Sequence, residues 1–141
     1  MSHYSKQYDG FAESIVTNSI VFPGIDIEKM SQNTNRYYSD NTLWDTGAQV
    51  TVISQKVVEQ LGLRPYSKGI LVGIGGDNES KTYLIHVLLP NGFLACDVEA
   101  YSGDIDDDIL IGMDVISLTD FIITNVGAKT TFTLKAPSEG I

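Results

Sequence analysis

Asp45 is the residue whose setting in the sequence is hardest to explain as ordinary structure. It is the only acid in residues 42–53 (TLWDTGAQVTVI), and mostly apolar and β-branched residues flank it on both sides. Aspartate is depleted in strands, and an unpaired buried carboxylate costs much free energy. Thr46 supplies a hydroxyl that donates and accepts, and Gly47 lets a backbone amide approach the carboxylate. The pattern indicates an acid held in a tight loop between two strands.

The same tripeptide also fits a simple turn. Aspartate often accepts a hydrogen bond from the backbone two residues on, and Asp-Thr-Gly is ordinary turn chemistry. By composition alone the tripeptide occurs by chance in roughly a few per cent of chains of this length. The tripeptide therefore gains meaning only from the elements around it.

Those elements are short and mostly β. Residues 14–22 and 37–44 are rich in β-branched and aromatic types, and residues 50–53 continue that pattern. Ser54 is suited to cap a helix over 55–61, and Gly62 stands where a helix ends. Further strands are expected at 70–72, 83–89, 93–100, 109–111, 121–124 and 130–134, with a second short helix capped by Asp114 and reaching about Leu118. The sequence predicts a mostly β, closed, barrel-like domain with one or two short helices.

The chain length allows one such domain. With 141 residues and 43% hydrophobic residues, the chain buries a core without needing a disulfide or a metal. Residues 1–12 are polar and are expected to form a flexible N-terminal segment, residues 13–136 the domain, and residues 137–141 a tail. Residues 26–36 are expected to form a long loop.

Three separated motifs together resemble the retropepsin-like aspartic proteases, which are single-domain and homodimeric. Leu-Trp-Asp-Thr-Gly-Ala at 43–48 is similar to the catalytic loop, Val-Gly-Ile-Gly-Gly at 72–76 to the tip of the flap hairpin, and Ile-Leu-Ile-Gly at 109–112 to the strand that supports the catalytic loop. Gly-Met-Asp at 112–114 before a short helix resembles the bacterial members. The resemblance covers about residues 13–135 and implies a closed, barrel-like retropepsin fold with a flap.

The resemblance also implies a role for each matching residue. Asp45 would be catalytic. The residues that would support its loop are Thr46, Gly47, Ala48, Ile111 and Gly112. The residues that would form the flap and bind substrate are Val72, Gly73, Ile74, Gly75 and Gly76.

The implied reaction is peptide-bond hydrolysis by an aspartic endopeptidase. Because the sequence holds one Asp-Thr-Gly, the second carboxylate would come from Asp45 of another copy in a homodimer. Two carboxylates about 4 Å apart repel by about 4 kcal/mol at an effective dielectric constant near 20, so they would share one proton and activate a water between them. We expect an acidic pH optimum, no cofactor and no metal, and a polypeptide substrate bound as an extended strand.

Charge and hydropathy exclude other classes of partner. The net charge is −9, and no basic patch offsets it, so binding to nucleic acid is not expected. No run of eighteen apolar residues or export signal is present, so we expect no membrane partner and a cytoplasmic location.

Other constellations point less clearly to chemistry. The glycines at 73–76 lack the lysine and the spacing of a phosphate-binding loop. The acidic residues at 104–108 lack the spacing of a calcium loop and are expected to be solvated. His3, His86 and Cys96 do not form a zinc set, and Cys96 is expected to be a buried small residue. The open alternative to a protease is a non-catalytic peptide-binding or protein-binding module on the same fold.

Overall fold

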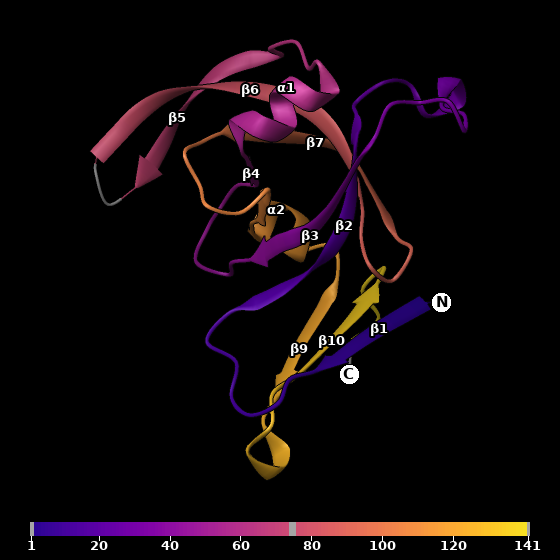
Figure 1. Cartoon of the computed structure of the whole chain (residues 1–141), viewed down its shortest axis with the longest axis vertical. Helices are drawn as coiled ribbons and strands as arrows, with labels where there is room; N and C mark the ends of the chain where they lie inside the picture. The colour runs from indigo at the N-terminus through magenta and orange to yellow at the C-terminus, as the bar shows by residue number, and fades with distance from the viewer. Residues whose placement is uncertain (1, 74–75, 141) are drawn as a thin grey trace.

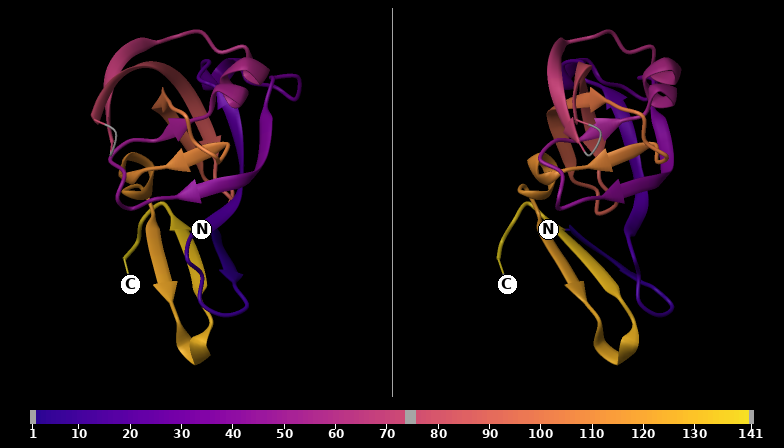
Figure 2. Two further views of the ribbon diagram at one scale, coloured as in Figure 1. Left: turned by 60° about the vertical axis from the view of Figure 1, so that its left-hand side comes forward. Right: turned by 90° about the vertical axis from the view of Figure 1, so that its left-hand side faces the viewer.

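The structure is a computed structural model that describes residues 2–73 and 76–140, and its strands form two sheets (Figures 1 and 2). The strands of the described residues are β1 (Ser2–Gln7), β2 (Ile15–Pro23), β3 (Tyr37–Trp44), β4 (Val52–Ile53), β5 (Ser67–Gly73), β6 (Gly76–Leu88), β7 (Leu94–Ser102), β8 (Ile109–Ile111), β9 (Asp120–Thr124) and β10 (Thr131–Ala136). The helices are η1 (Ile27–Lys29), α1 (Gln55–Leu61), α2 (Met113–Ile116) and η2 (Val126–Ala128).

The larger sheet closes on itself. Its strand order is β2-β3-β8-β4-β7-β6-β5, and an additional pairing of β2 with β6 closes six of these strands into a barrel. Side chains along β2 and β7 alternate between the core and the surface, as expected for sheets covered on one side. The prediction of a mostly β, closed barrel with short helices is confirmed.

The smaller sheet lies below the barrel and contains the first and last strands of the described chain (Figure 1). Its order is β1-β10-β9, with all pairs antiparallel. Residues 1–12 were expected to be flexible, but Ser2–Gln7 pair with β10 over six register positions. Their partner strand lies at the other end of the sequence, so local composition did not reveal the pairing.

An aromatic cluster joins the two sheets. The Trp44 ring centroid lies 5.9 Å from that of Phe121 and 5.5 Å from that of Phe132. The indole Nε1–H of Trp44 donates to Thr17 Oγ1 at 2.9 Å, so its polar edge is satisfied in the core. The residue before Asp45 is therefore fixed by contacts with β2, β9 and β10.

The first helix agrees with the sequence analysis in its boundaries and caps. The Ser54 side chain accepts a hydrogen bond from Val57 N–H, and Gly62 has φ 61° in the left-handed region. The second helix differs. Gly112 occupies its N-cap position, and Asp114 lies inside the first turn, where its carboxylate accepts from Val115 N–H and from the distant Thr51 hydroxyl.

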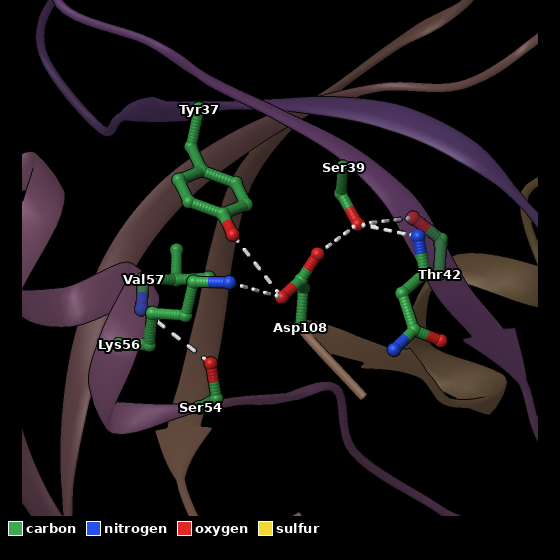
Figure 3. Close-up of polar contacts among 8 residues, drawn as sticks. Tyr37, Ser39, Thr42, Ser54, Lys56, Val57 and Asp108 are labelled. Carbon is green, nitrogen blue, oxygen red and sulfur yellow. Dashed lines mark hydrogen bonds and ion pairs between the residues drawn. The ribbon is translucent and has the colours of Figure 1, made fainter. Parts of the chain in front are cut away.

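A polar cluster fixes the start of β8 (Figure 3). The Asp108 carboxylate accepts hydrogen bonds from the Ser39 hydroxyl at 2.8 Å and the Tyr37 hydroxyl at 3.1 Å, and Lys56 Nζ lies 3.7 Å from it. Contact with the Tyr37 hydroxyl, followed by the charge of Asp108, raises the pKa of Lys56. Asp108 thus ties β3, α1 and β8 together.

Two further residues show how a bulge alters burial. Cys96 was expected to be buried but is exposed, because β7 turns Ala95 inward and Cys96 outward beside a register shift against β6. Partial desolvation and the nearby Asp97 charge raise the Cys96 pKa, which lowers its thiolate content.

His86 is buried on the neighbouring strand β6. Its Nε2 donates to Ile25 O at 2.6 Å, and its Nδ1 accepts from Asp97 N–H at 3.0 Å.

Candidate active site

Asp45 lies at the C-terminal end of β3, where that strand runs parallel to β8. The register pairs Trp44 with Ile111, and the Asp45 N–H donates to Ile111 O at 2.9 Å. Parallel neighbours are separated by long stretches of sequence, so β8 reaches this position from a distant part of the chain. The segment similar to a supporting strand therefore does contact the segment similar to a catalytic loop.

The loop after Asp45 is a tight turn. Gly47 N–H donates to Asp45 Oδ1 at 2.8 Å, and Ala48 N–H donates to Asp45 O at 3.2 Å. This is the backbone turn that the tripeptide alone could form. The carboxylate remains half-exposed, and Thr46 beside it is exposed, so the acid faces solvent at this point of the chain.

Gly112 makes the close approach of the two segments possible. A Cβ atom at Gly112 would lie 2.5 Å from Val50 O and 2.6 Å from Val50 C, closer than Cβ atoms come to backbone. Immediately after it, Met113 N–H donates to Ala48 O at 2.8 Å. Gly112 therefore sits directly under the loop that begins at Asp45.

Asp114 belongs to the Gly-Met-Asp motif and was expected to cap a helix, but its carboxylate contacts the loop after Asp45 as well. Its Oδ1 accepts from the Thr51 hydroxyl at 2.8 Å and its Oδ2 from Thr51 N–H at 3.1 Å. The Thr51 hydroxyl also accepts from Gly112 N–H at 3.3 Å. Nothing local in the sequence marks Thr51 as its partner, because the two residues are 63 positions apart.

A shallow pocket of about 310 Å³ opens beside Asp45. Its apolar wall includes Trp44, Phe121 and Ile123, and its polar rim includes Glu13. Glu13 belongs to a segment with no strand or helix pattern, so no sequence pattern associates it with Asp45. The pocket is therefore formed by the loop, by β9 and by the segment that leads into β2.

The predicted flap corresponds to the β5–β6 hairpin. Its register pairs Val72 with Asp77 and Gly73 with Gly76, and the hairpin extends as an arm beyond the barrel body (Figures 1 and 2). Ile74 and Gly75 lie outside the described residues. The hairpin itself is present, and its role as a flap stays a prediction.

The acidic loop before β8 is not arranged as a metal site. Asp104 and Asp106 are exposed, whereas Asp108 turns inward to its hydroxyl partners. Partial burial, followed by the charges of Asp106 and Asp108, raises the pKa of Asp107. Within residues 2–73 and 76–140, no group of three or more His, Cys, Asp and Glu side chains could hold a metal ion.

None of the helices in those ranges is long and apolar enough to cross a membrane.

Solved structures share this fold. The EIAV protease complexed with the inhibitor HBY-793 matches with a TM-score of 0.54 and 19% identity, over 74% of this chain and 86% of that one. A retropepsin-like aspartic protease from Rickettsia conorii matches with a TM-score of 0.55 and 15% identity, over 96% of this chain and 98% of that one. A comparison with curated proteins finds no match. At these identities the structural matches establish a retropepsin-like fold.

The structural matches show the fold of the chain, and a family model shows its family. The model described as "gag-polyprotein putative aspartyl protease" matches residues 35–118, which is more than half of the chain. The matched region includes β3, the Asp45 loop, the β5–β6 hairpin, β8 and α2. The chain therefore belongs to this family of retropepsin-like aspartic proteases.

Proposed function

We propose that the protein is an aspartic endopeptidase that uses Asp45 from each of two identical chains. The observation that carries the proposal is the position of Asp45. Its backbone is fixed between β3 and β8 by the bond to Ile111 O, while its carboxylate remains open to solvent. A rigidly held, accessible carboxylate is what general acid and base catalysis requires.

The chemistry needs two such groups. With two carboxylates close together, one is protonated and one ionised, because both charges at about 4 Å would cost about 4 kcal/mol. The ionised group takes a proton from a water that attacks the peptide carbonyl, and the protonated group donates to the carbonyl oxygen. The C–N bond then breaks as the nitrogen gains a proton. Among the described residues, one Asp-Thr-Gly loop is available per chain.

The surroundings of Asp45 are suited to a second copy. β9 pairs only with β10, so its other edge is unpaired within the described residues. A free strand edge pairs readily with another chain. Met113, which follows Gly112, and Ile123, which lines the pocket beside Asp45, are each 39% exposed. A second chain beside Asp45 would cover Ile123, which lines the pocket there.

Cleavage of a mixed peptide library at about pH 4–6 tests the proposal. The wild type should give products and Asp45→Asn should give none, because the amide neither loses nor shares a proton. Identical product profiles from the two proteins would refute catalysis by Asp45. A wild type that binds peptides but leaves them intact would favour a binding module.

Mixing experiments test the requirement for two chains. If equal amounts of wild type and Asp45→Asn pair at random, about half of the wild-type chains lie in mixed dimers, so activity per wild-type chain should fall to about half. A monomeric enzyme would show no change. Sedimentation at the assay concentration, measured in parallel, should show a dimer.

A further inference from the structure

The structure contains a side-chain link between α2 and the far end of the Asp45 loop. Thr51 is fully buried and presents two donors, its N–H and its hydroxyl, to the two oxygens of one carboxylate, Asp114. Hydrogen bonds to an ionised acceptor are stronger than neutral ones. This pair therefore fixes the backbone of Thr51, and not only its side chain, relative to α2.

The link is part of a longer series of contacts between residues 45–51 and 111–114. Met113 N–H donates to Ala48 O at 2.8 Å, and Asp114 N–H donates to Gln49 O at 3.2 Å. The first contact of the series is the hydrogen bond that Asp45 N–H donates to Ile111 O. Within it Asp114 supplies a charged side chain, whereas the bonds just named join backbone groups.

The geometry favours aspartate over asparagine at this position. Both carboxylate oxygens accept, so both Thr51 donors are satisfied. An asparagine would keep one oxygen and turn an NH₂ group toward a donor, which breaks one bond. Because Thr51 is buried, its unpaired donor could not turn to water.

We propose that Asp114 is a positioning residue that holds the Thr51 end of the loop and thereby sets the position of the Asp45 carboxylate. Asp114 acts through Thr51 and the backbone, and it takes no part in proton transfer. Its kinetic effect rests on the proposed function of Asp45. A displacement of about 1 Å at a catalytic group costs about 100-fold in rate, so a loosened loop should lower kcat without removing peptide binding.

The kinetic test compares variants at both ends of the link. Asp114→Asn should lower kcat about 10- to 100-fold and change KM less than about twofold. Thr51→Val, which removes the hydroxyl, should also lower kcat, and Thr51→Ser, which keeps it, should restore wild-type values. The double variant Asp114→Asn, Thr51→Val should be little worse than Asp114→Asn alone, because both changes break the same link.

Asp108 provides the matched control, since it is an aspartate bonded to two hydroxyls at the opposite end of β8. Asp108→Asn should lower the melting temperature but leave kcat within about twofold of wild type. If Asp108→Asn and Asp114→Asn lower kcat equally, general loosening of β8 explains both results and the specific role of Asp114 is refuted.

Amide hydrogen exchange tests the link without reference to activity. Exchange at Thr51, Gly112 and Met113 should be faster in Asp114→Asn than in wild type, and unchanged in Asp108→Asn. Unchanged exchange in Asp114→Asn would refute the positioning role even if the wild type cleaves peptides. A wild type that cleaves nothing would refute the proposed function, and exchange alone would then decide the structural link. Thr51→Val provides the same reading if Asp114→Asn does not fold.

Discussion

Replacing Gly112 with alanine tests whether the close approach of two backbone segments sets the position of Asp45. Gly112 has φ −96°, which alanine adopts without strain, so the added methyl acts through contact alone. That methyl carbon would lie 2.5 Å from Val50 O, whereas ordinary Cβ contacts begin near 3.4 Å and none falls under 3.0 Å. The two segments must therefore separate by roughly 0.5 Å or more.

The size of the effect follows from that separation. Overpacking of this kind costs about 1–3 kcal/mol of stability. If 1 Å of misplacement costs about 100-fold in rate, half that distance costs about tenfold when taken in proportion on the free-energy scale. Gly112→Ala should therefore unfold at lower urea concentration and show a kcat about tenfold below wild type.

Gly24→Ala is a matched control for the steric cost. A methyl carbon at Gly24 would lie 2.6 Å from Leu84 O and 2.7 Å from Leu84 C, nearly the same clash with backbone. Gly24 follows the C-terminal end of β2. The end of β2 near Asp45 is the opposite one, where Ile15 pairs with Trp44, the residue before Asp45. Gly24→Ala should lose similar stability and keep its kcat.

The assay is urea unfolding together with kcat and KM on one fluorogenic peptide cleaved by the wild type. The kinetic constants of both variants are measured without urea, at a temperature at which circular dichroism shows that each variant is folded. A Gly112→Ala variant with wild-type kcat would refute the reasoning, as would an equal loss of kcat in Gly24→Ala. A loss confined to Gly112→Ala would support it.

Two further predictions concern parts of the fold outside the loop. Trp44→Phe removes the indole hydrogen bond to Thr17 and part of a buried ring, and should lower the free energy of unfolding in urea by about 2 kcal/mol. Thr17→Val should lower that free energy less in the Trp44→Phe variant than in wild type. Equal losses in the two backgrounds would contradict a contribution from the hydrogen bond. The Ser138 hydroxyl, followed by backbone N–H groups of the C-terminal tail, lowers the pKa of Asp120 from 3.8, so the ionised form stabilises the native contact. That contribution should be complete above pH 3.8 and be lost as the pH falls through the lower native pKa of Asp120. The loss should appear as lower protection of the tail amides against hydrogen exchange, relative to an unstructured peptide at the same pH. An equal pH response in Asp120→Asn would contradict this prediction.

Local chemistry explains why much of the fold could be predicted from the sequence. Ser54 and Gly62 define helix α1 through bonds to residues three or four positions away. The β5–β6 hairpin joins strands that are adjacent in the sequence, with Gly73 paired to Gly76 at their ends. The tight turn at Asp45 follows from the Asp-Thr-Gly sequence, in which Gly47 N–H bonds to the carboxylate two residues before it, while the catalytic role of Asp45 stays a prediction. In each case the deciding interactions lie within a few residues or follow from residue type.

Pairings over long sequence distances explain what was missed. The composition of residues 1–12 predicts a flexible segment and does not reveal strand β1, because its partner β10 lies at the other end of the chain. The prediction that Cys96 is buried is wrong because the register shift beside it depends on how β6 pairs with β7. The bond between Asp114 and Thr51 spans 63 positions, and no local pattern signals it. Such contacts depend on the assembled barrel.

The parallel pairing of β3 with β8 has a consequence for the order in which the protein is made. The Thr51 hydroxyl accepts a hydrogen bond from Gly112 N–H, 61 positions away in the sequence, and Asp45 N–H donates to Ile111 O in the same region. A nascent chain on the ribosome cannot form these contacts before β8 and α2 have emerged from the exit tunnel. Loop closure over such a distance also favours slow folding. A chain truncated during synthesis before β8 would thus carry Asp45 without the partner strand that orders it.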